Sequence, residues 1–219
     1  KMIFATHVPI PGFNAIAKNV LKGIQDRLEY SPTCIQHGLT VQYLAHDSHR
    51  QFNNNKRYYC ASKYEIQNLS LPEYDYRPEH LKLTGVPRYD GLVNKDQRQI
   101  LITPTWRSYI AMPSVMGKSR PYNPNFKETD YFRIYNDLIH DQKLIETAKR
   151  TGYKLIYLLH PITSAQLEDY GEVENVELIQ ATTVNYEKIL CESSLMVTDY
   201  SGVQFDFAYM RKPVVYYHP

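Results

Sequence analysis

The stretch Thr-Asp-Tyr-Ser-Gly, residues 198–202, is a short polar segment between two apolar ones. A buried strand is predicted over 195–199 and a helix over 202–211. Ser201 is placed to be the N-cap of that helix, with Gln204 completing a Ser-x-x-Gln capping box. The free amides of such a helix start and the positive end of its dipole attract anions. The spacing predicts a phosphate site or, in the simpler interpretation, only a capped helix.

Gly202 and Asp206 extend this prediction from a phosphate to a nucleotide. Gly202 removes a side chain at the point where a ligand would come closest to the backbone. Asp206 lies one helical turn further on, where a carboxylate can accept hydrogen bonds from ribose hydroxyls, as in other nucleotide-binding α/β folds. In the simpler interpretation Asp206 is a solvated helix residue. The motif alone leaves both interpretations open.

Two histidines end predicted strands. His37 ends the segment IQHG, where Gly38 gives the turn room, and His160 ends LLHP. A single histidine at a strand end is more often structural, but here one lies in each half of the chain, and imidazole titrates near neutral pH. We expect His37 to act as a general base and His160 to stabilise charge that develops on a phosphate.

The segment TPTWRS, residues 103–108, is a third group with chemical potential. Thr105 supplies a hydroxyl, and Arg107 a guanidinium that can bind a phosphate with two parallel hydrogen bonds. The following segment, 108–128, has no clear periodicity, and its charges are all basic until Glu128. Such a loop is expected either to guide an anionic polymer or membrane surface, or to be a disordered flap.

Short apolar runs rich in β-branched residues alternate with helix-period segments along the whole chain. This alternation is the signature of a parallel sheet covered by helices, and it predicts an α/β fold. Helices are predicted over 13–28, 130–150, 185–194 and 202–211. A further helix is predicted to begin at a capping box formed by Ser62 and Glu65. Strands are predicted over 2–8, 33–38, 57–62, 99–105, 154–161, 176–179, 195–199 and 214–218, and the segment that begins at residue 80 also starts as a strand.

A segment rich in Gly, Pro and charge, near residues 86–96, is the best candidate for a domain boundary. It joins two halves in which strands and helices alternate, and two such halves can face each other across a cleft. Because α/β sheets bind ligands at the carboxyl ends of their strands, that cleft is a natural site for a nucleotide and a second substrate. The chain begins inside a predicted strand and ends directly after one, so we expect it to be truncated at both ends.

The composition excludes several classes of protein. The chain has 219 residues, 43% of them hydrophobic and 22% charged, which is ordinary for a soluble globular protein. A net charge of +2 gives no indication of nucleic acid as a partner. No apolar run approaches the roughly 20 residues of a membrane span, so any membrane association is expected to be peripheral. Three cysteines without metal or redox spacing indicate reduced thiols in the cytoplasm, and no metal-ligand cluster is recognised.

Blocks of the sequence resemble the CDP-glycerol glycerophosphotransferase family, of the teichoic-acid polymerase type. They are IQHGL, LTGVPRYDGL, ILITPTWRS, LLHP and VTDYSGVQFDFAYMRKPVVYY, and they run from about residue 33 onward, the last being the most specific. The resemblance implies a glycosyltransferase-B type fold, in which two Rossmann-like lobes face a cleft that contains the active site. The acceptor-side lobe would cover residues 1–92 and the CDP-donor-binding lobe residues 93–219. It also implies location at the cytoplasmic face of a bacterial cell membrane.

The resemblance implies roles for individual residues. His37 would be the catalytic base and His160 the second active-site histidine. The residues implied to hold the donor nucleotide or its phosphates are Thr105, Arg107, Thr198, Asp199, Ser201, Gly202 and Asp206.

The implied reaction moves glycerol phosphate, or a related polyol phosphate, from CDP-glycerol or another CDP-polyol to a hydroxyl of a growing teichoic-acid or capsule-type polymer. The acceptor would be a lipid-linked polyol phosphate or glycan. Deprotonated by His37, its hydroxyl would attack the β-phosphorus while CMP leaves, with no cofactor or metal required. The alternatives are a UDP-sugar epimerase or sugar transferase of the same fold, or an inactive nucleotide-binding fragment.

Overall fold

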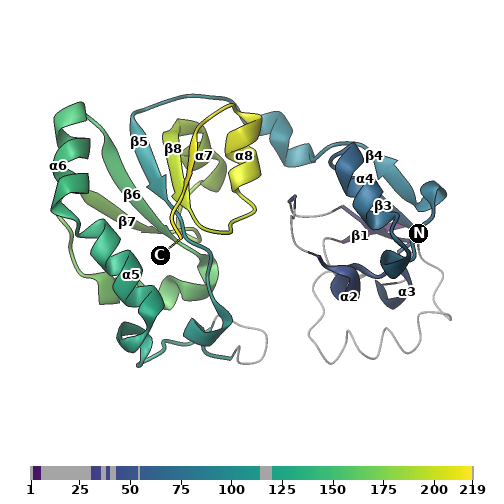
Figure 1. Ribbon diagram of the computed structural model, residues 1–219, viewed down its shortest axis with the longest axis horizontal. Coiled ribbons are helices and arrows are strands. Elements are labelled where there is room, and N and C mark those ends of the chain that lie inside the picture. The colour runs from purple at the N-terminus through teal and green to yellow at the C-terminus, as the bar shows by residue number, and fades with distance from the viewer. Residues whose placement is uncertain are drawn as a thin grey trace. The chain divides into compact units, whose positions relative to one another are not determined.

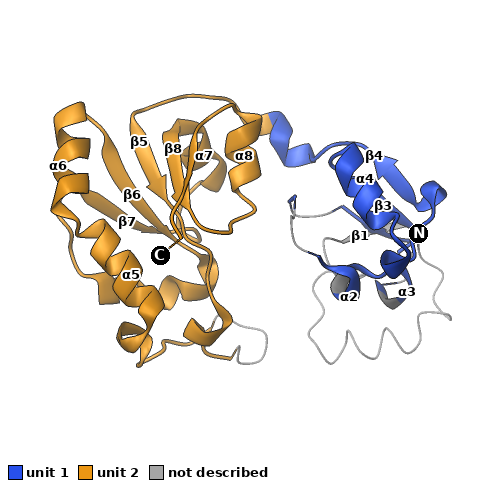
Figure 2. Cartoon of the chain, viewed as in Figure 1, with its two compact units in different colours: residues 1–90 blue, residues 91–219 orange. Residues whose placement is uncertain are grey.

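The computed structural model describes residues 2–5, 31–35, 38–39, 43–53, 55–113 and 120–218. The chain divides into two compact units, unit 1 over residues 1–90 and unit 2 over 91–219 (Figure 2). The sequence predicts a boundary between residues 92 and 93, and the units of the structure meet at Asp90 and Gly91. The helix predicted over 13–28 lies outside the described residues.

Unit 1 contains a parallel sheet in which, among the described residues, the strands follow the order of the chain, β1-β2-β3-β4 (Figure 1). Its elements are β1 (Met2–Ala5), β2 (Ser31–Cys34), α2 (Ala45–Ser48), α3 (Arg50–Asn53), β3 (Arg57–Cys60), α4 (Lys63–Leu69), the 3-10 turns η2 (Pro72–Tyr74) and η3 (Pro78–His80), β4 (Leu81–Leu83) and η4 (Pro87–Gly91).

The start of α4 tests a capping box that the sequence predicts. The Ser62 hydroxyl accepts the amide hydrogen of Glu65 across 3.2 Å, as the box requires. The Glu65 carboxylate bonds back to the amide of Ala61, one residue before the cap, across 2.6 Å. Both groups therefore satisfy amides at the start of the helix, with the reciprocal bond shifted by one residue.

Unit 2 contains a parallel sheet with strand order β7-β6-β5-β8-β9 among the described residues. Its elements are β5 (Gln99–Ile102), η5 (Ser108–Ile110), η6 (Phe126–Glu128), α5 (Asp130–Ile139), α6 (Gln142–Thr151), β6 (Lys154–Leu159), η7 (Pro161–Tyr170), β7 (Val176–Gln180), α7 (Tyr186–Glu192), β8 (Ser193–Thr198), α8 (Gln204–Tyr209) and β9 (Val214–Tyr216). The expected α/β fold with two Rossmann-like lobes is confirmed.

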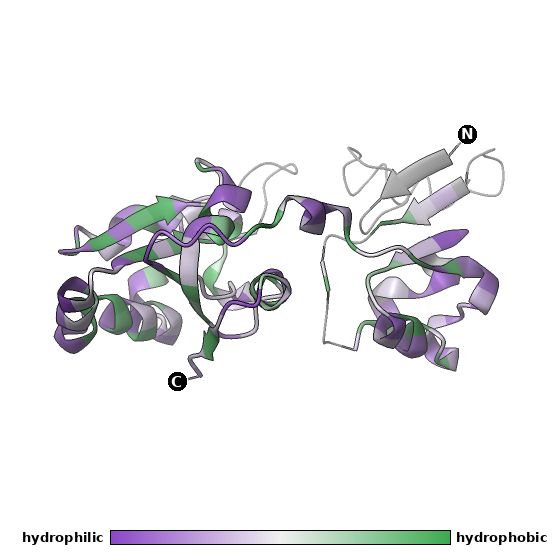
Figure 3. Cartoon of the chain, turned by 90° about the horizontal axis from the view of Figure 1, so that it is seen from above, coloured by the Kyte–Doolittle hydropathy of each residue, from purple (hydrophilic) through white to green (hydrophobic). Residues whose placement is uncertain are grey.

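The centre of the unit 2 sheet is covered on both faces. Every residue of β6 from Leu155 to Leu159 is buried, although neighbouring side chains of a strand point to opposite faces. On one face, Leu155, Tyr157 and Leu159 belong to the same hydrophobic cluster as buried side chains of α5 and α6. Figure 3 shows the consequence in the helices of unit 2, which carry hydrophobic and hydrophilic sides.

The prediction of a single long helix over 130–150 is wrong. The structure has two helices, α5 and α6, separated at His140 and Asp141. The carboxylate of Asp141 accepts the amide hydrogen of Leu144 across 2.7 Å, so Asp141 is the N-cap of α6. A new helix therefore begins where the sequence pattern predicts that the first one continues.

The strand order of unit 2 has one reversal. From β5 the chain proceeds to β6 and β7 on one side of the sheet, and β8 and β9 lie on the other side of β5. The reversal point lies between the carboxyl ends of β5 and β8, which is where open parallel sheets bind ligands. The segment TPTWRS follows β5, and TDYSG begins with the last residue of β8, so both begin at this point.

Candidate functional site at the carboxyl ends of β5 and β8

Asp199, the first residue after β8, joins the segments at the reversal point. Its Oδ1 accepts the amide hydrogens of Thr105 at 2.8 Å and Tyr200 at 2.6 Å. Its Oδ2 accepts from Arg107 Nη2 at 2.6 Å and from the Tyr135 hydroxyl at 3.0 Å. The carboxylate thus receives hydrogen bonds from the loop after β5, from its own turn and from α5.

The surroundings of Asp199 keep it ionised. Its side chain is 1% exposed, and such burial alone would raise the pKa of the carboxyl group. The bonds from the Thr105 and Tyr200 amides and from Arg107 outweigh burial, and the pKa of Asp199 lies below its ordinary value. The site therefore contains a buried negative charge that is neutralised by Arg107.

Arg107 is held in a defined orientation with part of its side chain accessible. Besides its bond to Asp199, its Nη1 donates to the Thr105 carbonyl at 2.6 Å. The guanidinium carbon lies 5.2 Å from the centre of the Tyr200 ring and 6.0 Å from that of Tyr131. The side chain is 29% exposed. It borders a hollow of about 130 Å³, whose other walls are Tyr109, Tyr131, Ile134, Tyr135, Asp199, Tyr200, Tyr217 and His218.

The two predicted threonines have different surroundings. The Thr198 hydroxyl is buried and donates to the Thr103 carbonyl across 2.8 Å, which links β8 to the end of β5. The Thr105 hydroxyl is buried and has no hydrogen-bond partner among the described residues. A buried hydroxyl without a partner is costly, so Thr105, unlike Thr198, keeps an unused hydrogen-bonding capacity next to Arg107.

The prediction that Ser201 is the N-cap of a helix starting at residue 202 is wrong. The helix α8 begins at Gln204, and Val203 occupies the N-cap position. The Ser201 hydroxyl accepts the amide hydrogen of Val203 across 3.3 Å, and the Gln204 side chain bonds to Tyr216. Residues 201–203 therefore form a turn before the helix, because the serine hydroxyl satisfies a nearby amide instead of opening a helix. Gly202, in this turn, is exposed.

Asp206, the predicted ribose ligand, lies in the first turn of α8 and is 1% exposed. The alternative interpretation, in which Asp206 is a solvated helix residue, is wrong because the residue is buried. A contact with ribose stays a prediction, which this burial does not favour.

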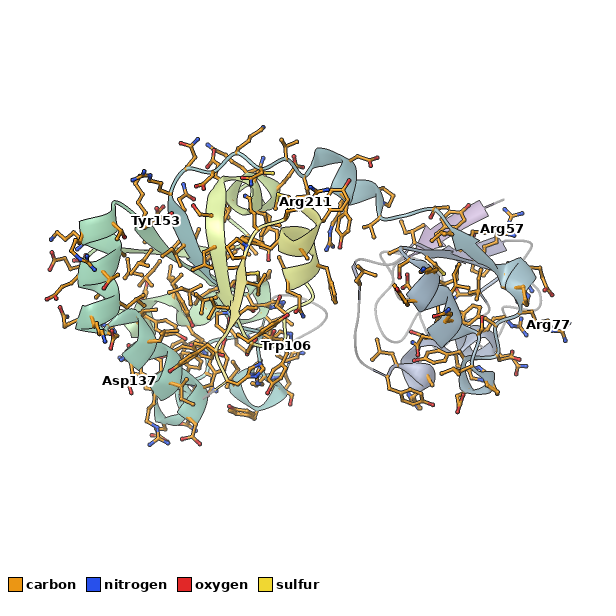
Figure 4. All side chains as sticks on the ribbon, turned by 45° about the horizontal axis from the view of Figure 1, so that its top comes forward. Arg57, Arg77, Trp106, Asp137, Tyr153 and Arg211 are labelled. Atoms are coloured by element: carbon orange, nitrogen blue, oxygen red, sulfur yellow. The ribbon has the colours of Figure 1, made fainter. Side chains whose placement is uncertain are left out.

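His160 follows β6 and has one defined hydrogen bond. Its Nδ1 accepts the amide hydrogen of Ile162 across 3.1 Å, so it caps the start of η7. Because Nδ1 acts as an acceptor, the neutral ring carries its proton on Nε2. Burial lowers the pKa of His160, which favours this neutral form. The Trp106 ring lies 6.1 Å away, centre to centre, in unit 2 (Figure 4). His160 can therefore donate a hydrogen bond from Nε2.

His37, the predicted base, lies outside the described residues, and its role stays a prediction. In the part of the chain that the structure describes, no group of three or more His, Cys, Asp or Glu side chains could hold a metal ion. Nor does any helix in that part combine the length and the apolar character that crossing a membrane requires.

Sequence reasoning missed Tyr135 and His218. Tyr135 contacts Asp199, which lies 64 positions away in the sequence. The only pattern in the sequence that marks Tyr135 is its helical spacing from Tyr131, and that spacing indicates only that the two residues share a helix face. His218 follows β9, and its ring stacks on Tyr200 with centres 4.7 Å apart. The search for histidines at strand ends that found His37 and His160 could have found His218 as well.

Comparison with known proteins identifies the relatives of the chain. The family model described as CDP-Glycerol:Poly(glycerophosphate) glycerophosphotransferase matches residues 33–219. The minor teichoic acid biosynthesis protein GgaB of Bacillus subtilis (strain 168) is 36% identical over 217 residues, which are 98% of this chain and 24% of GgaB. The chain thus spans about a quarter of the length of this relative.

Solved structures share the fold. The wall teichoic acid polymerase TagF has a TM-score of 0.58 at 17% identity, over 84% of this chain and 48% of TagF. A UDP-GlcNAc 2-epimerase from Neisseria meningitidis has a TM-score of 0.54 at 15% identity, over 97% of this chain and 57% of the epimerase. These likenesses show a fold of the glycosyltransferase-B type. The family model covers most of the sequence, and the chain belongs to the CDP-glycerol:poly(glycerophosphate) glycerophosphotransferase family.

Proposed function

We propose that this chain is part of a transferase that moves glycerol phosphate, or a related polyol phosphate, from a CDP-activated donor to a hydroxyl of a growing teichoic-acid or capsule-type polymer. The observation that carries the proposal is Arg107. Its guanidinium is fixed but partly exposed at the reversal point of the sheet, in a chain that belongs to this family. A fixed guanidinium is well suited to bind a diphosphate.

The donor diphosphate is proposed to contact groups that follow the strands of unit 2. Arg107 supplies positive charge, and Thr105 supplies the hydroxyl that lacks a partner among the described residues. The Ser201 turn offers the exposed backbone of Gly202. From the end of β6, His160 would donate the hydrogen on Nε2 to a phosphate oxygen.

The proposed reaction is a direct displacement at the β-phosphorus of the donor. His37 would take the proton of the acceptor hydroxyl, whose oxygen forms the new bond to phosphorus while the bond to the oxygen of CMP breaks. Arg107 and His160 would stabilise the negative charge on the leaving CMP. Such transfers depend on positioning and charge neutralisation, so a small set of side chains suffices.

The acceptor is proposed to be a lipid-linked polyol phosphate or glycan at the cytoplasmic face of the membrane, with the protein associated peripherally. The chain carries 25 Lys and Arg against 23 Asp and Glu. Because this balance gives little general attraction to anionic lipid, the acceptor itself would provide most of the attachment. A vesicle flotation assay with and without a lipid-linked acceptor tests this. Equal binding to both vesicles would contradict it.

Calorimetric titration of the chain with CDP, UDP and CMP tests the donor site. We expect CDP to bind most tightly, and Arg107→Lys to weaken it about tenfold, because lysine cannot form two parallel bonds to a phosphate. Equal affinity for CDP and UDP would contradict the proposed donor. A transfer assay with CDP-glycerol then compares the wild type with His37→Ala, and full activity of the variant would exclude His37 as the base.

The epimerase alternative has only the shared fold in its favour, at 15% identity. The two functions differ in their donor, so turnover of a UDP-sugar without turnover of any CDP-polyol would favour the epimerase. Binding of CDP without any transfer would favour the third alternative, an inactive nucleotide-binding module.

A further inference from the structure

We propose that Asp199 and Tyr135 are positioning residues that fix Arg107 and tie the loop after β5 to the turn after β8. This inference rests on the proposed function, because it concerns the guanidinium that would meet the donor diphosphate. It assigns Asp199 a role that acts through Arg107, in place of the direct contact with the donor that the sequence predicts.

Asp199 has no free side through which to bind a donor. A carboxylate offers about four lone-pair directions, and the described residues Thr105, Tyr200, Arg107 and Tyr135 already provide four donors. Its side chain is 1% exposed, and a direct approach of its charge to a diphosphate would be repulsive. The charge therefore serves the protein donors around it.

These four bonds connect three separate parts of unit 2. Thr105 and Arg107 belong to the loop after β5, Tyr200 belongs to the turn after β8, and Tyr135 belongs to α5. The sequence separations between Asp199 and its partners Thr105 and Tyr135 are 94 and 64 residues. One carboxylate thus sets the distance between the two segments that are proposed to hold the diphosphate.

Tyr135 holds the oxygen that binds Arg107. Its hydroxyl lies 3.0 Å from Oδ2 of Asp199, the same atom that accepts from Arg107 Nη2. The residue is 3% exposed, and burial together with the charge of Asp199 raises the pKa of Tyr135 well above its ordinary value. The hydroxyl therefore keeps its hydrogen at neutral pH and donates it to Asp199.

The consequence for Arg107 is a lower entropic cost of binding. A long side chain that is free to rotate loses that freedom when it binds an anion, which weakens affinity. Here the bonds to Asp199 and to the Thr105 carbonyl, together with the Tyr131 and Tyr200 rings, limit that freedom before the ligand arrives. Loss of the Tyr135 hydroxyl would loosen the carboxylate and, through it, the guanidinium.

Titration of Tyr135→Phe and Asp199→Asn with CDP and with cytidine tests the inference. We expect Tyr135→Phe to weaken CDP about fivefold and Asp199→Asn more than about tenfold, because a charge-assisted hydrogen bond is lost in each. Affinity for cytidine, which lacks the diphosphate, should change less than about twofold in both. This ratio between the two ligands is what a purely structural role would leave unchanged.

Tyr157→Phe is the matched control. It removes another buried tyrosine hydroxyl from unit 2. Among the described residues, that hydroxyl bonds to the Tyr170 hydroxyl across 2.9 Å and has no hydrogen bond with Arg107 or Asp199. It should lower the melting temperature as Tyr135→Phe does and leave the ratio of CDP to cytidine affinity at the wild-type value.

Three results overturn the inference. It is wrong if Tyr135→Phe retains the wild-type ratio of CDP to cytidine affinity, and this variant decides the matter even where Asp199→Asn does not fold. It is also wrong if Tyr157→Phe changes the ratio equally. If the wild type binds CDP no more tightly than cytidine, the proposed function fails first, and the inference fails with it.

Discussion

The ammonium nitrogen of Lys212 lies 2.6 Å from the carbonyl oxygen of Cys191, inside unit 2. The same nitrogen donates to the carbonyls of Leu190 at 2.9 Å and Ser193 at 2.6 Å, and the residue is only 6% exposed. The carbonyls at the carboxyl end of a helix lack partners within the helix. Lys212 therefore satisfies the end of α7 and connects it to the segment that leads into β9.

Replacement of Lys212 by Met should lower the free energy of unfolding by about 3 kcal/mol, because three buried carbonyls lose a donor, and that of Cys191 keeps a second one, the Lys95 amide. Urea unfolding of the chain measures this. Lys149→Met is the control, since Lys149 is largely exposed and pairs with Glu174 at the surface, where ion pairs contribute little. Equal midpoints for Lys212→Met and the wild type would show that these bonds do not stabilise the fold.

Replacement of Asp141 by Ala should lower the free energy of unfolding by about 1 kcal/mol, because α6 loses its N-cap. The comparison variant is Asp137→Ala, on the exposed side of α5, where the side chain points away from the sheet (Figure 4). In thermal unfolding, the midpoint temperature should be lower for Asp141→Ala than for the wild type and nearly unchanged for Asp137→Ala. A similar decrease in both variants would point to net charge instead of the cap.

His160 should titrate below its ordinary pKa of 6.5, because burial disfavours the charged ring. An unfolded chain then binds a proton more readily than the folded one, so stability falls as the pH drops below 6.5. Nitrogen NMR should show Nδ1 without and Nε2 with a proton at pH 7. Asparagine can also cap a helix, so His160→Asn should keep the stability of the wild type at pH 7 and lose less of it at pH 5. A protonated Nδ1 at pH 7 would contradict the assigned hydrogen bond.

Asp199→Asn should be less stable than the wild type at neutral pH, and this difference in the free energy of unfolding should become smaller in acid. The pKa of Asp199 is lowered in the folded protein, so its charge stabilises the fold above the ordinary value of 3.8. That contribution is lost as the pH falls below 3.8 toward the folded pKa. The difference in unfolding free energy between wild type and variant should be equal at pH 7 and pH 5 and smaller at pH 3. A difference that is as large at pH 3 would show that charge is not what stabilises the site.

The strands of unit 2 could be predicted because their pattern is local. The run from Leu155 to Leu159 is continuously apolar, which is what burial on both faces of a parallel sheet requires. The strand ends then placed Arg107 and His160 at the carboxyl edge of the sheet without any knowledge of tertiary contacts.

The function of Asp199 within the site could not be predicted from a local pattern. Its partners Thr105 and Tyr135 are 94 and 64 positions away, and no spacing in the sequence links them to the motif TDYSG. The starts of α6 and α8 were not predicted correctly, for another reason. Ser201 and Asp141 are both residue types that cap helices, and tertiary packing decides which of them does so.

The placement of Trp106 beside His160 has an optical consequence. It is the only tryptophan in the sequence, and the Arg120 guanidinium lies 5.4 Å from its ring on the described part of the loop. Indole emission responds to nearby charge and is quenched by a protonated imidazole. The chain also has twenty tyrosines, so indole emission must be excited at wavelengths that tyrosine does not absorb. Tryptophan fluorescence then reports on the surroundings of a single histidine, and no label has to be attached to follow them.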